Sequence, residues 1–357
     1  MKGKRFHKAF TLNGVSFSSE EDLLVFVQTI SDSITVFLND WFSEQSFIVV
    51  QTSGSTGVPK PIRLKKTFMR NSAKGTGDFF GLQENTTALL CMSTDYIAGK
   101  MMLIRALTLG WQLDVVTPKS NPLVGIDKEY DFSAMVPLQL QNSLPDIHCV
   151  KKLIDGGGAV SMELQKRIQH IETQIFATYG MTETITHIAV KKLNHFATIL
   201  KDTKEKKIAG SFYKVVPNIT IYKDERNCLL IKAPKVSDDF IITNDVVSLI
   251  SDTEFEWLGR FDNVINSGGI KLHPEKIEEK LAVLIKERFF VAGIKDTFLG
   301  EKLVLIVEGE EKTYRFSSVG NIAKYEIPKE VYFVTKFIET ETKKIQRSKT
   351  LNLLSLF

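Results

Sequence analysis

The sequence has few cysteines and no long apolar run. Its three cysteines, Cys91, Cys149 and Cys228, are far apart and form no CxxC or Cys/His spacing. This pattern indicates neither a disulfide framework nor a zinc site, and predicts buried free thiols in a reducing compartment. No stretch of about 18 apolar residues occurs, so we expect no membrane-spanning helix. The basic start MKGKRFHKAF lacks the apolar segment of a signal peptide, so we expect a cytoplasmic protein.

The chain also has little excess of charge of either sign. The net charge is +4 over 357 residues, and no dense Lys/Arg stripe accompanies it. This distribution argues against a nucleic-acid partner. The composition, 43% hydrophobic and 25% charged with 24 Phe, is that of a globular protein with a large core. The length predicts about two domains.

Strand-like and helical segments alternate through the first half of the chain. This alternation with short turns predicts an α/β fold with a largely parallel sheet. We expect strands at 47–51, 87–93, 112–118, 132–137, 150–158 and 174–180, and helices at 20–43, 99–109 and 161–170.

The texture of the sequence changes from about residue 209, where short strands and turns predict an antiparallel meander. After Arg260 the pattern is β–α–β. We therefore predict a large N-terminal domain, residues 1–260, in which α/β sheets are joined by antiparallel strands. A small, mobile C-terminal α+β domain would span residues 261–357.

A Gly-rich, hydroxyl-rich loop follows the strand at 47–51. Glycines let backbone N–H groups converge on a phosphate, hydroxyls can donate to its oxygens, and a lysine adds positive charge. Pro59 and Pro61 flank the lysine and exclude a Walker A loop, whose helix start proline would block. A flexible linker is the alternative. The candidate nucleotide-binding residues are Thr52, Ser53, Gly54, Ser55, Thr56, Gly57 and Lys60.

The nine residues TSGSTGVPK resemble the phosphate-binding loop of the adenylate-forming superfamily, which includes acyl-CoA synthetases, peptide-synthetase adenylation domains and luciferases. The resemblance extends over almost the whole chain. It implies an acid–thiol ligase that uses ATP and Mg²⁺, with coenzyme A as co-substrate. A carboxylate and ATP would give acyl-AMP and pyrophosphate, and a thiol would then give the thioester and AMP.

A second block, ATYGMTET, strengthens the resemblance. The resemblance implies that Tyr179 and Gly180 line the adenine and acyl pocket. Thr182 would contact the α-phosphate, and Glu183 would hold Mg²⁺, which favours carboxylate and phosphate oxygens. Taken alone, the block could be a turn with one exposed glutamate.

Four further residues fit the nucleotide by resemblance. Gly156 and Gly157, in DGGGA, would lie against the adenine and acyl groups, with a tight turn as the alternative. Asp245 would accept hydrogen bonds from the ribose hydroxyls. Arg260 would reach the ribose or a phosphate, with a surface Arg–Asp pair as the alternative.

The segment after Arg260 resembles the superfamily's hinge and thiolation block. Asp262 would be the residue whose dihedral angles absorb a domain rotation. Gly268, Gly269 and Lys271, in NSGGIKLHPE, would line the coenzyme A tunnel.

The C-terminal segment ETKKIQR resembles the block that carries the superfamily's catalytic lysine. Aligning Ile345 and Arg347 with that block selects Lys344 as the catalytic lysine. Thr182 and Glu183 complete the set of catalytic residues that the resemblance implies. The usual Asn-Gly before the lysine is absent here, so Lys343 remains a second candidate. A basic solvated tail is the structural alternative.

The early position of the phosphate loop resembles the short bacterial o-succinylbenzoate–CoA ligases of menaquinone biosynthesis, in which the N-terminal subdomain is trimmed. Their substrate has two carboxylates, of which one reacts and the other needs a cationic or donor partner. Each candidate could instead be a solvated or packing residue. The candidates for this acyl pocket are Tyr96, Lys100, Arg105, Thr186 and His187.

Two other functions remain open from the sequence. The chain could be a different aryl- or acyl-CoA ligase or a stand-alone adenylation enzyme, or a non-catalytic nucleotide-binding protein, which the departure before Lys344 would suit. The partners we expect are a small carboxylic acid, ATP and coenzyme A, without nucleic acid or membrane insertion. A homodimer is compatible with the sequence.

Overall fold

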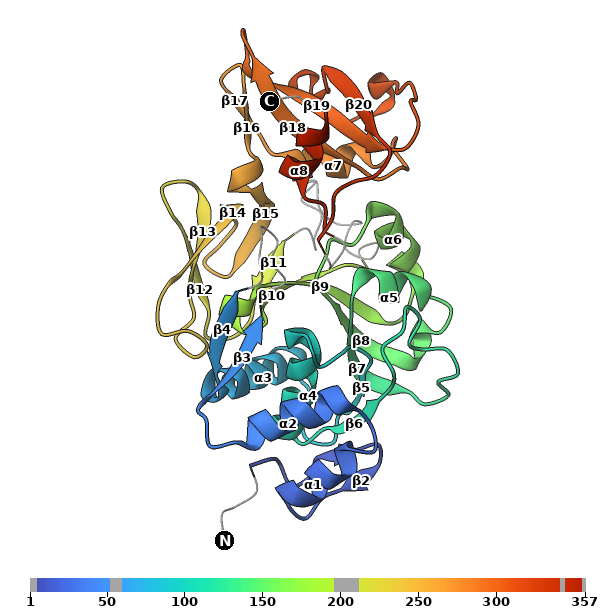
Figure 1. Ribbon diagram of the computed structural model, residues 1–357, viewed down its shortest axis with the longest axis vertical. Helices are drawn as coiled ribbons and strands as arrows, with labels where there is room; N and C mark the ends of the chain where they lie inside the picture. Colours follow the sequence, from blue (N-terminus) through green and yellow to red (C-terminus); the bar gives the residue numbers. More distant parts are fainter. Residues whose placement is uncertain (1–4, 52–59, 196–211, 341–343, 355–357) are drawn as a thin grey trace, which may run out of the picture.

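The computed structural model describes residues 5–51, 60–195, 212–340 and 344–354 (Figure 1). Their strands form a 13-stranded sheet, a 5-stranded sheet and a two-stranded ribbon. The large sheet has the order β12-β13-β14-β15-β11-β10-β9-β8-β7-β5-β6-β1-β2. This mixture of a large sheet and helices confirms the predicted α/β class.

One half of the large sheet is mostly parallel. The pairs β1–β6, β6–β5, β5–β7, β7–β8 and β8–β9 are all parallel, and only the short edge strand β2 is antiparallel. The strands are β1 Thr11–Leu12, β2 Val15–Ser16, β5 Thr87–Leu90, β6 Gln112–Val115, β7 Tyr130–Met135, β8 Val150–Asp155 and β9 Gln174–Gly180.

Helices cover both faces of this parallel part (Figure 1). The side chains of α3 and α4 belong to one hydrophobic cluster, which also includes Phe132 and Ile154 from the sheet. The side chains of α5 and α6 belong to a second cluster, which includes Leu153. Neighbouring residues of β8 therefore face opposite layers, as the period of a strand requires. The helices are α3 Lys66–Phe80, α4 Ile97–Leu109, α5 Pro137–Asn142 and α6 Met162–Arg167.

The other half of the large sheet is antiparallel, as the meander texture predicted. Its strands are β10 His187–Lys192, β11 Tyr213–Val215, β12 Thr220–Lys223, β13 Cys228–Lys232, β14 Ile241–Leu249 and β15 Glu254–Arg260. Because β10 returns antiparallel to β9, the sheet changes character at the carboxyl end of β9.

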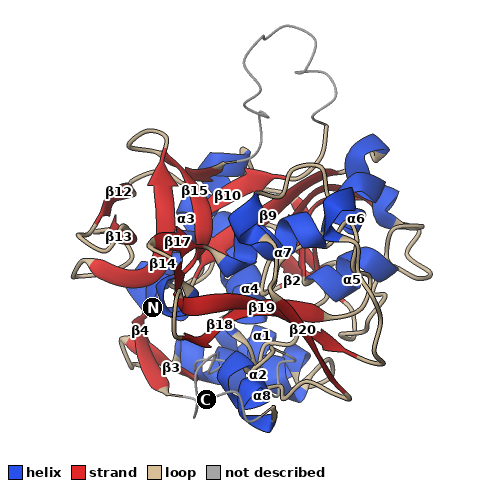
Figure 2. Ribbon diagram, turned by 90° about the horizontal axis from the view of Figure 1, so that it is seen from above, coloured by secondary structure: helices blue, strands red, loops and turns tan. Residues whose placement is uncertain are grey.

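The C-terminal strands form a separate sheet, seen at the top of Figure 1 and from above in Figure 2. Arg260 ends the last strand of the large sheet, and Ile265 begins the first strand of the small one. The boundary predicted at residue 260 coincides with this change, and the division into two domains remains a prediction. The elements are β16 Ile265–Ser267, β17 Ile270–Leu272, α7 Pro274–Leu281, β18 Phe289–Asp296, β19 Gly300–Glu308, β20 Glu330–Val334 and α8 Arg347–Leu353.

Short 3-10 turns connect several of these elements. They are η1 Ile147–Cys149, η2 Ile168–His170, η3 Thr182–Thr184, η4 Phe261–Asn263, η5 Phe316–Ser318 and η6 Lys324–Glu326.

Two expectations for the N-terminal segment were wrong. The single helix predicted at 20–43 is two helices, α1 Glu20–Val27 and α2 Asp32–Phe42. Between them the Thr29 hydroxyl donates to the Phe26 carbonyl at 2.7 Å, and Ser31 is extended, so side-chain hydrogen bonding competes with the helix.

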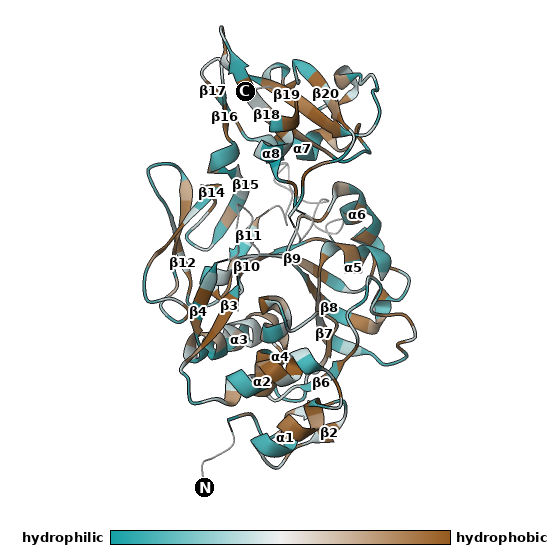
Figure 3. Cartoon of the chain, viewed as in Figure 1, coloured by the Kyte–Doolittle hydropathy of each residue, from teal (hydrophilic) through white to brown (hydrophobic). Residues whose placement is uncertain are grey.

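The second wrong expectation is that the strand at 47–51, before the phosphate loop, is a buried strand of the α/β sheet. β3 Phe47–Gln51 pairs with β4 Pro61–Lys65 as an antiparallel ribbon outside the large sheet. Its apolar run is therefore only half buried, and Val49 is 53% exposed. β3 is nevertheless strongly apolar (Figure 3), whereas β4 alternates apolar residues with Arg63 and Lys65.

The prediction of buried free thiols is confirmed. All three thiols are free and buried. Among the described residues, none of the helices has the length and apolarity needed to cross a membrane.

Candidate active site

The carboxyl ends of β8 and β9 lie side by side, because Asp155 pairs with Ala177 in the parallel register. The Thr178 hydroxyl donates to the Asp155 carbonyl at 2.9 Å. A Cβ on Gly156 would lie 2.5 Å from that hydroxyl, and Gly157 has a φ of +84°. Both predicted glycines therefore sit where a side chain would be strained, at the edge where α/β sheets bind ligands.

Asp155 carries an unusual carboxyl group. It is 1% exposed, and neither of its oxygens has a hydrogen-bond partner among the described residues. Burial raises its pKa to about 8, because an unpaired charge is costly away from water. Asp155 is the first residue of the DGGGA segment, and the sequence alone does not reveal that its carboxyl is buried.

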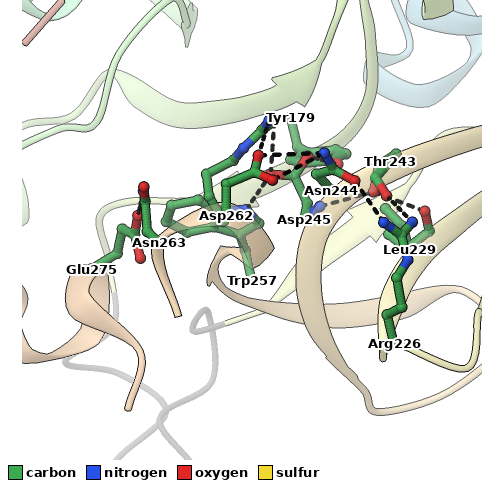
Figure 4. Close-up of polar contacts among 11 residues, drawn as sticks. Tyr179, Arg226, Leu229, Thr243, Asn244, Asp245, Trp257, Asp262, Asn263 and Glu275 are labelled. Carbon is green, nitrogen blue, oxygen red and sulfur yellow. Dashed lines mark hydrogen bonds and ion pairs between the residues drawn. The ribbon is translucent and has the colours of Figure 1, made fainter. Parts of the chain in front are cut away.

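Tyr179 and Asp245 form the centre of a polar network (Figure 4). The Tyr179 hydroxyl donates to Asp245 Oδ2 at 2.6 Å, and Trp257 Nε1 donates to Asp245 Oδ1 at 3.0 Å. Burial, and then the Asp245 carboxylate, raise the pKa of the Tyr179 phenol. Arg260 lies 3.8 Å from Asp245. The structure thus brings together three predicted nucleotide residues, and adds Trp257, which no sequence motif indicated.

The predicted hinge residue lies beside this network. Asp262 Oδ2 is 3.2 Å from Arg260 Nη2, and Asn244 Nδ2 donates to it at 3.3 Å. Arg226 Nη1 in turn donates to Asn244 Oδ1 at 2.9 Å. A chain of polar contacts therefore connects Arg226 in the β12–β13 turn with Asp262.

The turn after β9 is strained and closely packed. Ile185 has a φ of +67°, which is unfavourable for a β-branched residue. The N–H of Thr186 donates to the Thr184 carbonyl at 2.8 Å across it. The Thr184 hydroxyl bonds to Met181 and Thr186 and holds the turn. A Cβ on Gly180 would lie 2.3 Å from the Thr186 carbonyl oxygen. Strain maintained in this way is typical of functional sites.

This turn presents Thr182 and Glu183 next to the Tyr179 network. Glu183 is exposed, and its carboxylate makes no hydrogen bond or ion pair with the described residues. The described residues contain no cluster of three metal-ligating side chains. A single free carboxylate nevertheless suits Mg²⁺, which is commonly held by one or two carboxylates and the phosphates of its nucleotide. Glu183 would hold the ion, and the ion would neutralise phosphate charge.

A fully buried cation, Arg105, lies beside this turn. Arg105, on α4, is 1% exposed, and its Nε and Nη2 lie 3.3 Å and 3.4 Å from the hydroxyls of Thr76 and Thr186. His187 Nε2 is 3.3 Å from the Thr76 hydroxyl. Arg105 has no ion pair with any described residue, and burial lowers its pKa to about 9. Burial, and then Arg105, hold the pKa of His187 well below its usual range.

Three of the five acyl-pocket candidates thus meet, and Thr76 of α3 joins them. The other two do not. Lys100 donates to the carbonyls of Thr94 and Asp95, the latter at 3.2 Å, and Tyr96 is 62% exposed. No sequence motif indicated Thr76, because its contact with Arg105 depends on how α3 packs against α4.

The remaining predicted residues lie apart from one another. Lys60 is exposed before β4, and the loop residues from Thr52 to Gly57 lie outside the described residues, as does Lys343. Lys344 is exposed, and its N–H donates to the Thr340 hydroxyl at 3.1 Å.

The predicted coenzyme A residues form a hairpin. Gly268 and Gly269, with φ of +57° and +80°, make the two-residue turn between β16 and β17, which is the positive-φ geometry of a tight hairpin. Lys271 follows on β17 and is exposed. This hairpin belongs to the C-terminal sheet, away from β9 (Figure 1).

The fold and these side chains define a class of protein. The sequence model of the AMP-binding enzymes matches residues 36–229, more than half of the chain, so the chain belongs to the AMP-binding enzyme family. The predicted resemblance to adenylate-forming acyl-CoA ligases is therefore confirmed, with ATP as the nucleotide of that family.

Particular relatives narrow the comparison. The chain is 26% identical over 346 residues to the 2-succinylbenzoate–CoA ligase of Geobacillus sp. strain WCH70, covering 86% of this chain and 68% of that one. It is 25% identical to the enzyme of the same name from Bacillus cytotoxicus, covering 90% and 73%.

Solved structures agree. An acyl-CoA synthetase (AMP-forming)/AMP-acid ligase II-like protein from Dyadobacter fermentans is 35% identical, covers 91% of this chain and 95% of its own, and superposes with a TM-score of 0.60. The o-succinylbenzoate CoA synthetase of Bacillus subtilis, with its acyl-adenylate intermediate, is 18% identical and has a TM-score of 0.72, covering 90% and 75%. The latter likeness supports the fold.

Proposed function

We propose that this chain activates o-succinylbenzoate with Mg²⁺ and ATP and transfers the acyl group to coenzyme A. The observation that carries the choice of acid is Arg105, a buried guanidinium without a carboxylate partner among the described residues. Removing a charge from water is costly unless an opposite charge compensates it. A dicarboxylic acid can supply that charge with its non-reacting carboxylate.

The surroundings of Arg105 suit a carboxylate. The hydroxyls of Thr76 and Thr186 lie beside the guanidinium. The Thr76 hydroxyl donates to the Ser72 carbonyl at 3.1 Å, whereas the Thr186 hydroxyl can turn to donate to an anion. His187, whose pKa is held low, would stay neutral and add no competing charge at neutral pH. A monocarboxylic acid would leave Arg105 uncompensated, which predicts discrimination against it.

In the first step an oxygen of the reacting carboxylate would attack the α-phosphorus of ATP, and pyrophosphate would leave. Negative charge grows on the phosphates, so positioned donors and cations lower the barrier. Lys344, Thr182 and Mg²⁺ on Glu183 would serve the α-phosphate. Lys60 and its loop would hold the leaving phosphates, and Asp245 with Arg260 would hold the ribose.

In the second step the thiolate sulfur of coenzyme A would attack the acyl carbon, and AMP would leave. The C-terminal domain, residues 261–357, would rotate at Asp262 and bring Gly268, Gly269 and Lys271 to the acyl adenylate. The polar contacts of Asp262 with Arg260 and Asn244 are the ones such a rotation would change.

Another aryl- or acyl-CoA ligase, or an adenylation enzyme with another thiol acceptor, is the alternative. Pyrophosphate release with matched acids separates these functions. We expect o-succinylbenzoate to be preferred by about 100-fold in kcat/KM over 4-oxo-4-phenylbutanoate and 2-butanoylbenzoate, which each lack one carboxylate, because a site built for a polar group rejects ligands without it. A preference for either single acid would overturn the choice of substrate.

Two variants locate the selectivity. Arg105→Met should reduce the preference for the dicarboxylic acid, measured against the single acid that keeps the reacting carboxylate, to within about 10-fold, as a buried charge partner is lost. Lys100→Met, on the same helix but outside the cluster, should keep it. If Lys100→Met loses the preference and Arg105→Met does not, the second carboxylate binds elsewhere.

A further inference from the structure

A cavity of about 400 Å³ lies on the outer side of β14–β15, between the β12–β13 turn and the β16–β17 hairpin. Its size is at the lower end of the range typical of small-molecule sites, about 300–1,000 Å³. No acidic side chain belongs to its wall. The lining residues are Lys223, Arg226, Asn227, Val246, Val247, Ser248, Leu258, Phe261, Val264, Asn266, Lys271 and His273.

The charged side chains of the wall are basic, and two are not neutralised. Among the described residues, the Lys223 ammonium makes only a 3.3 Å hydrogen bond to Asn227, and the Lys271 ammonium makes no ion pair or hydrogen bond. Arg226 is compensated by Asp224 at 2.7 Å. His273 adds a buried Nδ1 without a hydrogen-bond partner. Two ammonium groups thus remain available to an anion.

The rest of the wall is largely apolar, with three valines, a leucine and Phe261. Phe261 also lies under the Arg226 guanidinium, 5.3 Å from the ring centroid. A purely inorganic anion would leave this apolar surface in contact with water. An anion attached to an aromatic or aliphatic body would bury it as well.

The wall belongs to both sides of the predicted hinge. Val246 and Leu258 come from the large sheet, and Asn266 and Lys271 from the small one. Arg226 is joined to Asp262 through Asn244, with contacts of 2.9 Å and 3.3 Å (Figure 4). A molecule in the cavity would contact both sheets at once, so it would bind best to the arrangement in this structure.

We infer that this cavity binds a small organic anion with an apolar body, and that its occupancy holds the C-terminal strands in the present arrangement. The binding site follows from the cavity alone. The effect on the reaction also depends on the proposed function, since it requires the C-terminal segment to move between the two steps.

Binding is tested with 8-anilinonaphthalene-1-sulfonate, an aromatic sulfonate, and with N-phenyl-1-naphthylamine, its uncharged counterpart. Fluorescence titration should show that Lys223→Met/Lys271→Met weakens the sulfonate at least 10-fold and leaves the amine within 2-fold. Lys329→Met/Lys336→Met removes the same charge from exposed positions outside the wall and should keep the wild-type affinity. If both double variants weaken sulfonate binding equally, or if neither weakens it, the proposed site would be overturned.

The conformational effect is tested by timing the two half-reactions separately. With saturating sulfonate, the pyrophosphate burst of the wild type should stay within 2-fold, while thioester formation should slow at least 5-fold. Lys223→Met should lose most of that inhibition. Thioester formation at an unchanged rate would overturn the conformational effect. A protein that releases no pyrophosphate with any acid would instead overturn the proposed function and leave the binding result intact.

Discussion

The Tyr179 hydroxyl donates a 2.6 Å hydrogen bond to Asp245 Oδ2 and so connects β9 with β14, two strands that three others separate in the sheet. Trp257 holds the other oxygen of the same carboxylate. A carboxylate offers about four lone-pair sites, so two remain for the hydroxyls of a ribose. The network therefore orients Asp245 before the nucleotide binds.

Removing the tyrosine hydroxyl tests this orientation. Tyr179→Phe should raise the KM for ATP by about 5-fold, because one charge-assisted hydrogen bond is lost, and should change kcat less. Tyr213→Phe is a matched control. Tyr213 stacks on Phe255 in the same aromatic group, and its hydroxyl makes no hydrogen bond to the described residues. Steady-state pyrophosphate release measures both. An equal rise in KM for Tyr213→Phe would point to packing instead of orientation.

The buried carboxyl of Asp155 predicts a stability that depends on pH. Its pKa is about 8 in the folded protein and about 3.9 in an unfolded chain. Between these values the folded state keeps a proton that the unfolded state has lost, so the free energy of unfolding falls as the pH rises.

Asp155→Asn removes that dependence. The variant should match the wild type near pH 4 and exceed its free energy of unfolding by several kcal/mol, on the order of 3, near pH 8. Urea unfolding at both pH values measures this, with the exposed Asp127→Asn as control. A difference of the same size at both pH values would mean that the carboxyl does not titrate as its burial requires.

Local patterns predicted the strands of the parallel half closely. Gln174–Gly180 forms a strand over the residues expected, as does Phe47–Gln51 outside the large sheet, because β-branched runs bounded by turn residues are strong local signals. The failures concern what a strand or helix meets later. Nothing in FIVVQ reveals that its partner is β4 and not the large sheet, and periodicity at 20–43 does not detect a side chain that bonds to the backbone.

The candidate site shows the same limit. Motifs selected Tyr179, Asp245 and Arg260, which the structure brings together. Motifs could not select Thr76, which reaches Arg105 only because α3 packs on α4. The charges of Lys100 and Arg105 look alike in the sequence, yet only one is buried without a counter-charge, since burial depends on tertiary packing.

Arg347 predicts how firmly the C-terminal helix is held. Its two terminal nitrogens lie 2.8 Å and 2.9 Å from the two oxygens of Glu278 on α7. Burial raises the pKa of Glu278 to about 7, although Arg347 opposes that shift. Arg347→Met would leave this half-buried carboxyl with the Val291 N–H, which donates to Glu278 Oε1 at 2.9 Å, and without its charged partner.

We expect Arg347→Met to lower the free energy of unfolding by about 1–3 kcal/mol, because two charge-assisted hydrogen bonds to a half-buried carboxyl are lost. Adding Glu278→Leu should restore most of it. Lys276→Met, which breaks a more exposed pair with Glu256, should cost less than about 1 kcal/mol. Urea denaturation compares them, and a double variant no more stable than Arg347→Met would argue against the pair as the cause.

The choice between Lys343 and Lys344 can be decided by separating the two half-reactions. Arg347 fixes the helix that begins three residues after Lys344, and the pairing of Glu339 with Ile345 fixes the backbone on its other side. Lys344 is thus held between two anchored points, which suits a group that must be positioned against developing charge. Lys344→Ala should lower pyrophosphate release by about 100-fold or more, since preorganised electrostatic groups contribute on that order.

The same variant should keep the second step. Thioester formation from pre-formed acyl adenylate should stay within about 3-fold of the wild type, because attack of the thiol on the acyl carbon needs no cation at the α-phosphate in this mechanism. Lys343→Ala should affect both steps by less than about 10-fold. If Lys343→Ala loses pyrophosphate release and Lys344→Ala retains it, the adjacent lysine is catalytic. If Lys344→Ala slows both steps equally, its side chain supports the fold of the segment and not the chemistry of adenylation.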